Sequence, residues 1–161
     1  MRGRTVIYEE DQRQLQAICE QLGREAVARA VFLLDKNGQI LVASGETASI
    51  DVTSLASLVA GTSSATSSLA RLLGEEEFTM QFHQGLRDSL FISMVSDEHI
   101  LTVLFDHRST LGLIRLRAKR ASHALVEVLE AVTNRSEDPQ EENIFDGLTD
   151  EDIESLFGSR L

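Results

Sequence analysis

The chain has 161 residues, of which 42% are hydrophobic and 25% are charged, and its formal net charge is −11. This length suits one globular domain with a core of its own. The acidic balance excludes a nucleic-acid surface, because phosphate binding needs clustered, uncompensated lysine and arginine. The single cysteine cannot form an internal disulfide, and the sequence contains no signal-peptide or membrane-span pattern. We therefore expect a cytoplasmic protein with no membrane insertion.

The first predicted helix covers about residues 9–22, where apolar side chains repeat at helical spacing and Gly23 follows the end. Two short apolar runs, 30–34 and 40–43, come next. Asn37-Gly38 lies between these runs and indicates a hairpin, because both central residues of that turn type take positive φ.

A second helix is predicted from Val52, behind Asp51 as N-cap, to Gly74. Three further strands are predicted at 79–84, 89–95 and 99–105. A last helix begins after Ser109 or Thr110. The order α-β-β-α-β-β-β-α predicts an α+β fold, in which helices cover both faces of a five-stranded antiparallel sheet.

The acidic residues are concentrated at the C-terminal end. Residues 134–161 contain nine acids and two arginines, and so carry −7 of the net charge. We place the domain boundary near Thr133, which gives a domain at 1–133 and an acidic flexible tail at 134–161. Within the tail, Thr149 as N-cap and six large apolar residues predict a short amphipathic helix at about 149–157. These residues are Ile144, Phe145, Leu148, Ile153, Leu156 and Phe157. The segment either folds into a groove on a partner or packs back on its own domain.

The helix at 52–74 contains no charged residue before Arg71. At about 100° per residue, one apolar side is predicted to cover the sheet; it comprises Leu55, Leu58, Val59, Thr62, Thr66, Leu69 and Leu73. The opposite side is small and hydroxyl-rich, and it comprises Thr53, Ser57, Ala60, Ser64, Ser67, Ser68 and Arg71. A solvated helix side normally carries lysine and glutamate, so this one predicts a helix–helix or protein-docking surface, which Gly61 favours. The alternative is a serine-rich surface open to water.

Motifs for catalysis are missing. The chain has no Gly-Lys pair for a phosphate loop, and its four histidines lack the spacing of metal ligands. We expect no enzyme, no catalytic residue, no metal and no cofactor. A basic cluster at the start of the last helix is a solvated surface, a contact for an acidic partner or the chain's own tail, or a source of an arginine supplied in trans. The cluster comprises Arg108, Arg115, Arg117, Lys119 and Arg120.

Five stretches together resemble the Roadblock/dynein light chain family, most closely its bacterial polarity regulators. They are VFLLDKNGQ (31–39), IDVTSLASLVAG (50–61), LARLLGEEEF (69–78), QFHQG (81–85) and LFDHRSTLGLIRLRAKRAS (104–122). The match covers roughly residues 5–133, and the tail keeps an acidic ending of the family's type at 150–157.

The resemblance implies a homodimer that pairs the long middle helices and the strands that follow them. It implies that two chains bind one Ras-like GTPase through a platform on these helices, and that they accelerate GTP hydrolysis by reshaping the GTPase without an arginine finger. The setting implied is cell polarity and gliding motility, with recruitment to a cell pole, and the tail helix is implied to touch a second GTPase surface.

The platform residues implied by the resemblance are Ser57, Ala60, Gly61, Ser64, Ala65 and Ser68. Ser64 and Ser68 depart from the alanine or glycine that the family tends to have there. The alternative function is a scaffold of the same fold that binds a GTPase or another partner without stimulating hydrolysis.

Overall fold

A computed structural model describes residues 6–137 of the chain, so the predicted tail helix and its six apolar residues lie outside the described part. The elements are α1 (Glu9–Glu25), β1 (Ala30–Asp35), β2 (Ile40–Gly45), α2 (Val52–Leu72), β3 (Met80–Gln84), β4 (Ser89–Ser96), β5 (His99–Phe105) and α3 (Leu111–Glu137). Their order confirms the predicted α+β fold.

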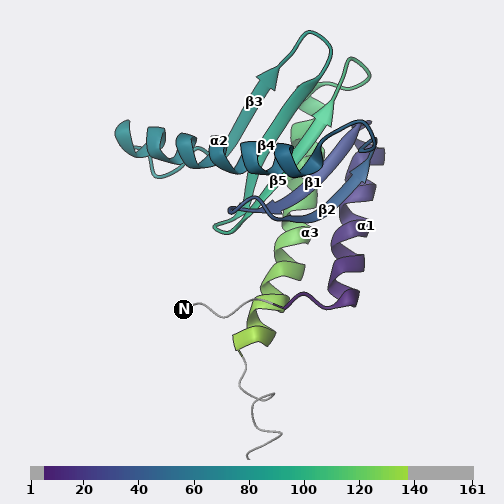
Figure 1. The fold of residues 1–161 in the computed structure, drawn as a ribbon, viewed down its shortest axis with the longest axis vertical. Coiled ribbons are helices and arrows are strands. Elements are labelled where there is room, and N and C mark those ends of the chain that lie inside the picture. The colour runs from purple at the N-terminus through teal and green to yellow at the C-terminus, as the bar shows by residue number, and fades with distance from the viewer. Residues whose placement is uncertain (1–5, 138–161) are drawn as a thin grey trace, which may run out of the picture.

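All five strands form one antiparallel sheet in the order β2-β1-β5-β4-β3. Helices α1 and α3 lie behind the sheet in Figure 1, and α2 crosses in front of it. The fold therefore has three layers, with a helix pair on one face of the sheet and a single helix on the other.

Strand β1, which lies between β2 and β5, is buried on both faces, which explains its unbroken apolar run. Successive side chains of a strand point to opposite faces of the sheet. Val31 and Leu33 accordingly pack against α1 and α3, whereas Phe32 and Leu34 pack on the α2 side.

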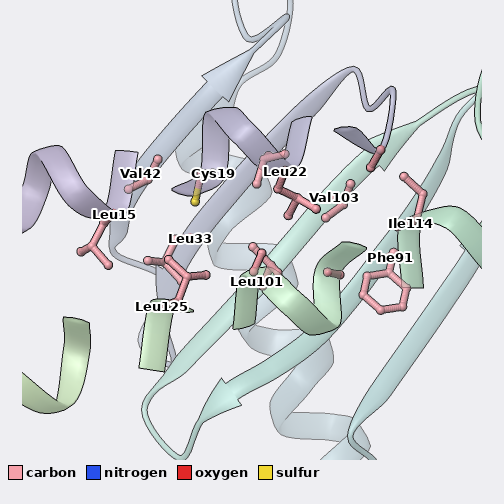
Figure 2. Packing of buried hydrophobic residues seen from close by; sticks show 14 of the residues in the cluster. Leu15, Cys19, Leu22, Leu33, Val42, Phe91, Leu101, Val103, Ile114 and Leu125 are labelled. Atoms are coloured by element: carbon pink, nitrogen blue, oxygen red, sulfur yellow. The ribbon is translucent and has the colours of Figure 1, made fainter. Parts of the chain in front are cut away.

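The larger core lies between the sheet and the α1–α3 pair (Figure 2). Leu15 and Cys19 of α1 and Leu125 of α3 are each 0% exposed, as helical spacing predicts. Burial raises the pKa of the Cys19 thiol to about 12. Cys19 is thus a packed core residue with little thiolate at neutral pH.

The predicted end of the first helix at Gly23 is wrong, because α1 continues to Glu25. The chain leaves the helix through Val27, which takes a left-handed conformation with φ 54°. The Ala28 amide then donates to the Gly23 carbonyl at 2.9 Å. This hydrogen bond satisfies a carbonyl of the last helical turn, in the manner of a Schellman motif.

The Asn37-Gly38 hairpin is present, but only Gly38 has positive φ, at 86°. The Asp35 carboxylate stabilises the turn, since it accepts hydrogen bonds from the Asn37 and Gln39 amides, each at 2.9 Å. A Cβ on Gly38 would lie 3.2 Å from the Ser57 Cα. The hairpin therefore needs glycine both for its conformation and for its close approach to α2.

Helix α3 reaches Glu137, so residues 134–137 of the predicted linker are helical. Arg135 in this last turn donates to the Asp11 carboxylate of α1, with a distance of 2.6 Å between Nη2 and Oδ1. The last turn of α3 is thereby fixed against the start of α1.

Candidate protein interface

The limits of α2 follow from its end residues. The Asp51 carboxylate accepts a hydrogen bond from the Ser54 amide at 3.1 Å, and its bonds to Ser54 lower the pKa of Asp51. Gly74, at φ 78°, follows the last turn. Both ends agree with the sequence prediction, since an acidic N-cap and a left-handed glycine are common helix boundaries.

The side of α2 that faces the sheet agrees with the prediction only in part, since Leu55 and Val59 pack there as expected. The buried residues of α2 are Ala56, Val59, Ala60, Ser63 and Ala70. Leu58, Leu69 and Leu73, which we expected on the sheet, are 71%, 48% and 64% exposed. The residues that α2 buries are mostly small, and three of its leucines lie outside the packed side.

The outward side of α2 forms a regular stripe, which we call the α2 seam. It comprises Ser54, Leu58, Gly61, Ala65, Ser68 and Leu72, all exposed. The steps between successive members alternate between four and three residues, which is the repeat of a coiled-coil contact. Leu58 and Leu72 are 71% and 81% exposed, so the seam has small residues at its centre and a large apolar residue towards each end. The sequence contained this spacing, but the predicted interface omitted both leucines.

Several hydroxyl groups on α2 already donate to the backbone of their own helix. The donors Thr62, Ser67 and Ser68 bond to the carbonyls four residues before them, at 2.8, 3.0 and 3.2 Å respectively. A partner that covers these three residues therefore leaves their hydroxyl donors satisfied.

The predicted interface residues occupy four different positions. Gly61, Ala65 and Ser68 belong to the α2 seam. Ser57, Ser64 and Arg71 are exposed at intervals of seven residues and form a parallel line, the α2 flank. Ser67 is exposed outside both stripes, and Ala60 is only 8% exposed. Ala60 thus packs beneath the helix and contributes little to its outward surface.

Strand β3 provides a second feature next to α2 in the chain, after the short connection 73–79. It lies at the end of the sheet and, within the described part of the chain, pairs only with β4. Its Phe82 ring stacks on Phe105 with 6.0 Å between centroids, which fixes the strand to the core. The other edge of β3 presents backbone groups that a further strand can pair with.

The predicted basic cluster is divided by its ion pairs. Arg108 donates from Nε to Oδ1 of Asp106 at 3.0 Å, and this hydrogen bond lowers the pKa of Asp106 to about 2. Nη1 of Arg117 lies 3.7 Å from the Glu25 carboxylate. The remaining members, Arg115, Lys119 and Arg120, are exposed on α3, on the opposite side of the sheet from α2.

Within residues 6–137, no group of histidine, cysteine, aspartate and glutamate side chains is placed to hold a metal ion. His99 donates to or accepts from Ser96 at 3.0 Å, and burial lowers its pKa. No helix in the described part of the chain is long and apolar enough to cross a membrane. The structural features that remain to be explained are thus surfaces, foremost the α2 seam and the α2 flank.

The five-stranded antiparallel sheet, with two helices on one face and one on the other, defines a three-layer α+β domain. The family model of the Roadblock/LC7 domain matches residues 14–105. The chain belongs to the Roadblock/LC7 family.

Solved structures give nearer relatives. MglB of Myxococcus xanthus is 48% identical, with a TM-score of 0.75 over 79% of this chain and 96% of that one. The gliding protein MglB of Thermus thermophilus is 33% identical, with a TM-score of 0.74 over 81% and 99% of the two chains. A structure described as MglB with tetrameric arrangement is 31% identical, with a TM-score of 0.76 over 82% and 99%. No match was found among curated protein sequences.

Proposed function

We propose that the chain is a homodimeric regulator of an MglA-type, Ras-like GTPase in bacterial cell polarity and motility. Two chains bind one GTPase and accelerate its GTP hydrolysis by reshaping it. The observation that carries the proposal is the α2 seam, an uncharged stripe on the most exposed helix of the fold. The similarity to MglB over most of the chain supports the same assignment.

The α2 seam fits a second copy of itself. Two seams that cross antiparallel at Ala65 bring Leu58 of one chain next to Leu72 of the partner subunit, because both lie seven residues from Ala65. Gly61 and Ser68 beside the crossing allow the two backbones to come close. Such a contact is isologous, as dimer interfaces with twofold symmetry require. The open edge of β3 extends the same contact by strand pairing.

The α2 flank supplies the GTPase platform. In the proposed dimer the seams are covered, whereas Ser57 and Ser64 of each chain stay exposed beside them. Small side chains there allow the GTPase backbone to approach both helices. The dimer thus forms the platform, and neither chain alone provides it.

The proposed mechanism acts through position. Phosphoryl transfer depends mostly on alignment and electrostatic stabilisation, so a protein that holds the switch segments of a GTPase in place accelerates hydrolysis without a catalytic group of its own. Arg71 is the one cation of α2, and its Nη2 donates to Ser68 Oγ at 3.2 Å. This hydrogen bond holds Arg71 along its own helix.

Adjacent residues allow the dimer and the platform to be tested separately. Ala65→Arg places a long cation in the α2 seam and is expected to give a monomer by sedimentation velocity, with loss of GTPase binding. Ser64→Arg places the same side chain on the α2 flank and is expected to keep the dimer and abolish GTPase binding. Retained tight binding by Ser64→Arg contradicts the platform, and a dimeric Ala65→Arg contradicts the seam.

A further inference from the structure

The outward side of the first half of α3 carries cations that the described part of the chain does not neutralise. Arg115, Lys119 and Arg120 are exposed, and residues 6–137 provide none of them with an ion pair. Helix α3 also has no acidic residue in its first turn, where the helix dipole adds positive potential. This half of α3 is therefore a region of uncompensated positive charge.

Leu116 lies among these cations and is 56% exposed. Ile114 and Ala118 of the same turns are 0% and 1% exposed against the sheet, so Leu116 is the large apolar side chain that this stretch directs outwards. Together, Arg115, Leu116, Lys119 and Arg120 form what we call the α3 patch. Its chemistry suits an acidic segment that carries apolar side chains.

Such a segment follows α3 in the sequence. Residues 138–161 contain eight acids against Arg160 alone. Five of these acids fall within 144–157, the stretch that also contains the six large apolar residues. We propose that residues 144–157 dock on the α3 patch of their own chain, with apolar side chains over Leu116 and carboxylates beside the cations. This contact does not depend on the proposed regulation of a GTPase.

The length of the connection fits this placement. Seven extended residues from Glu137 to Ile144 span about 23 Å. Because an α-helix rises about 1.5 Å per residue, Ala124 lies about 20 Å back along α3 from Glu137. The five residues from Ile144 to Thr149 span up to about 17 Å, and a helix over 149–157 covers about 12 Å more, so together they reach past the level of Leu111. The segment then lies antiparallel beside 111–124, and that stretch contains the whole α3 patch.

The site stays accessible in the proposed dimer, since α3 and α2 lie on opposite faces of the sheet (Figure 1). Docking on α3 and pairing through the α2 seam can therefore occur together. A partner with a stronger site for residues 144–157 has to displace them from α3 first.

The test uses a spin label on the tail of the full-length protein. Ser155→Cys adds a reactive thiol, whereas Cys19 is 0% exposed and is not labelled. The measurement is the paramagnetic loss of amide intensity in NMR spectra of isotope-labelled protein that carries the spin label. An excess of protein without isotope or spin label is added, so that contacts between chains contribute little to the loss. We expect amides at 112–123 to lose most of their intensity and those of the α2 seam to lose none. Unchanged amides at 112–123, or a loss that disappears on dilution, overturns the proposal.

Charge reversals on the spin-labelled protein test the patch itself. Lys119→Glu is expected to restore most of the lost intensity. About 1 M NaCl is expected to do the same, because it screens the attraction between exposed charges beyond about 3 Å. The matched control is Arg87→Glu, which makes the same charge change at another exposed position and is expected to restore none. Equal effects of the two variants overturn the proposal, since the tail is then attracted by net charge rather than by the patch.

Discussion

The Asp11 carboxylate and the Arg135 guanidinium are hydrogen bonded at 2.6 Å across 124 positions of sequence. The Asp11 side chain is only 9% exposed, and its second oxygen accepts from the Tyr8 amide at 3.2 Å. The Arg135 cation also lies 5.3 Å from the centre of the Tyr8 ring. This contact joins the start of α1 to the end of α3, within the first residues of the predicted tail.

A double-mutant cycle on Asp11→Ala and Arg135→Ala is expected to give a coupling of about 1 kcal/mol in the free energy of unfolding, because one partner is nearly buried. The control is the Glu9–Arg13 pair, which is 82% and 75% exposed and is expected to couple by less than about 0.5 kcal/mol. Urea denaturation measures both cycles. Equal couplings would show that the Asp11–Arg135 contact is an ordinary surface pair.

A chain that ends at Thr133 is likewise expected to unfold more easily than one that ends at Glu137.

Val27 is the one non-glycine residue among 6–137 with positive φ, and it is β-branched. Side chains of this shape are strained in the left-handed region, where glycine is not. Val27→Gly is therefore expected to stabilise the protein by about 1 kcal/mol. Val27→Ala, the control, removes the branch but keeps the left-handed L-residue, and it is expected to gain less. A destabilised Val27→Gly would contradict the conformation of this turn.

The core on the α1–α3 side sets most of the stability. Leu125→Ala is expected to cost about 3 kcal/mol, because Leu125 is 0% exposed and the change leaves a cavity. Leu86→Ala is the control with the same chemistry at a position that is 107% exposed, and it is expected to change the free energy of unfolding by less than about 0.5 kcal/mol. Equal losses in urea denaturation would contradict the packing shown in Figure 2.

The Asp106–Arg108 contact predicts a dependence of stability on pH. The hydrogen bond from Arg108 lowers the pKa of Asp106 from 3.8 to about 2 in the folded protein. Folding thus favours the charged form of Asp106. The stabilisation that it gives the folded protein is complete above the pKa of Asp106 in the unfolded chain, and it is lost as the pH falls through the pKa in the folded protein. The stability difference between the wild-type protein and Asp106→Asn is expected to be constant above pH 5 and to shrink between about pH 4 and pH 2. A constant difference over that window would contradict the contact.

Element types and order could be predicted from the sequence, because each element has its own local signal. Asp51 and Gly74 mark the two ends of α2, and the apolar stripes of α1 and α3 face one side only. The orientation of α2 could not be predicted in the same way. This helix has apolar residues on two sides, with Val59 towards the sheet and Leu58 away from it. Periodicity alone does not tell which side packs on the sheet, so the prediction is confirmed for Leu55 and Val59 but wrong for Leu58, Leu69 and Leu73.

The candidate site was predicted in part for the same reason. Gly61, Ala65 and Ser68 lie on the exposed side of α2. They could be predicted because small residues at helical spacing are recognisable in the sequence. The burial of Ala60 depends on the close approach of α2 to the sheet, and only the assembled fold shows it. The ion pairs of Arg108 and Arg117 with their acidic partners also come from the folded structure, so the basic cluster could not be divided beforehand.

The arginines distinguish the proposed mechanism from a finger supplied in trans. Arginine fingers are typically worth 10³ to 10⁵ in rate. We expect the single variants Arg71→Ala, Arg115→Ala and Arg120→Ala each to keep most of the stimulation of GTP hydrolysis, because none acts on the phosphate. Loss of stimulation in one variant that still binds the GTPase would replace the reshaping mechanism by a finger.

Single-turnover GTP hydrolysis by the MglA-type GTPase, titrated with this protein, tests the central claim most directly. We expect a rate that rises and saturates at two chains per GTPase, with no stimulation by Ser64→Arg. Binding at that ratio without a change in rate would contradict the activator and leave a scaffold, and absence of binding would contradict the GTPase as partner.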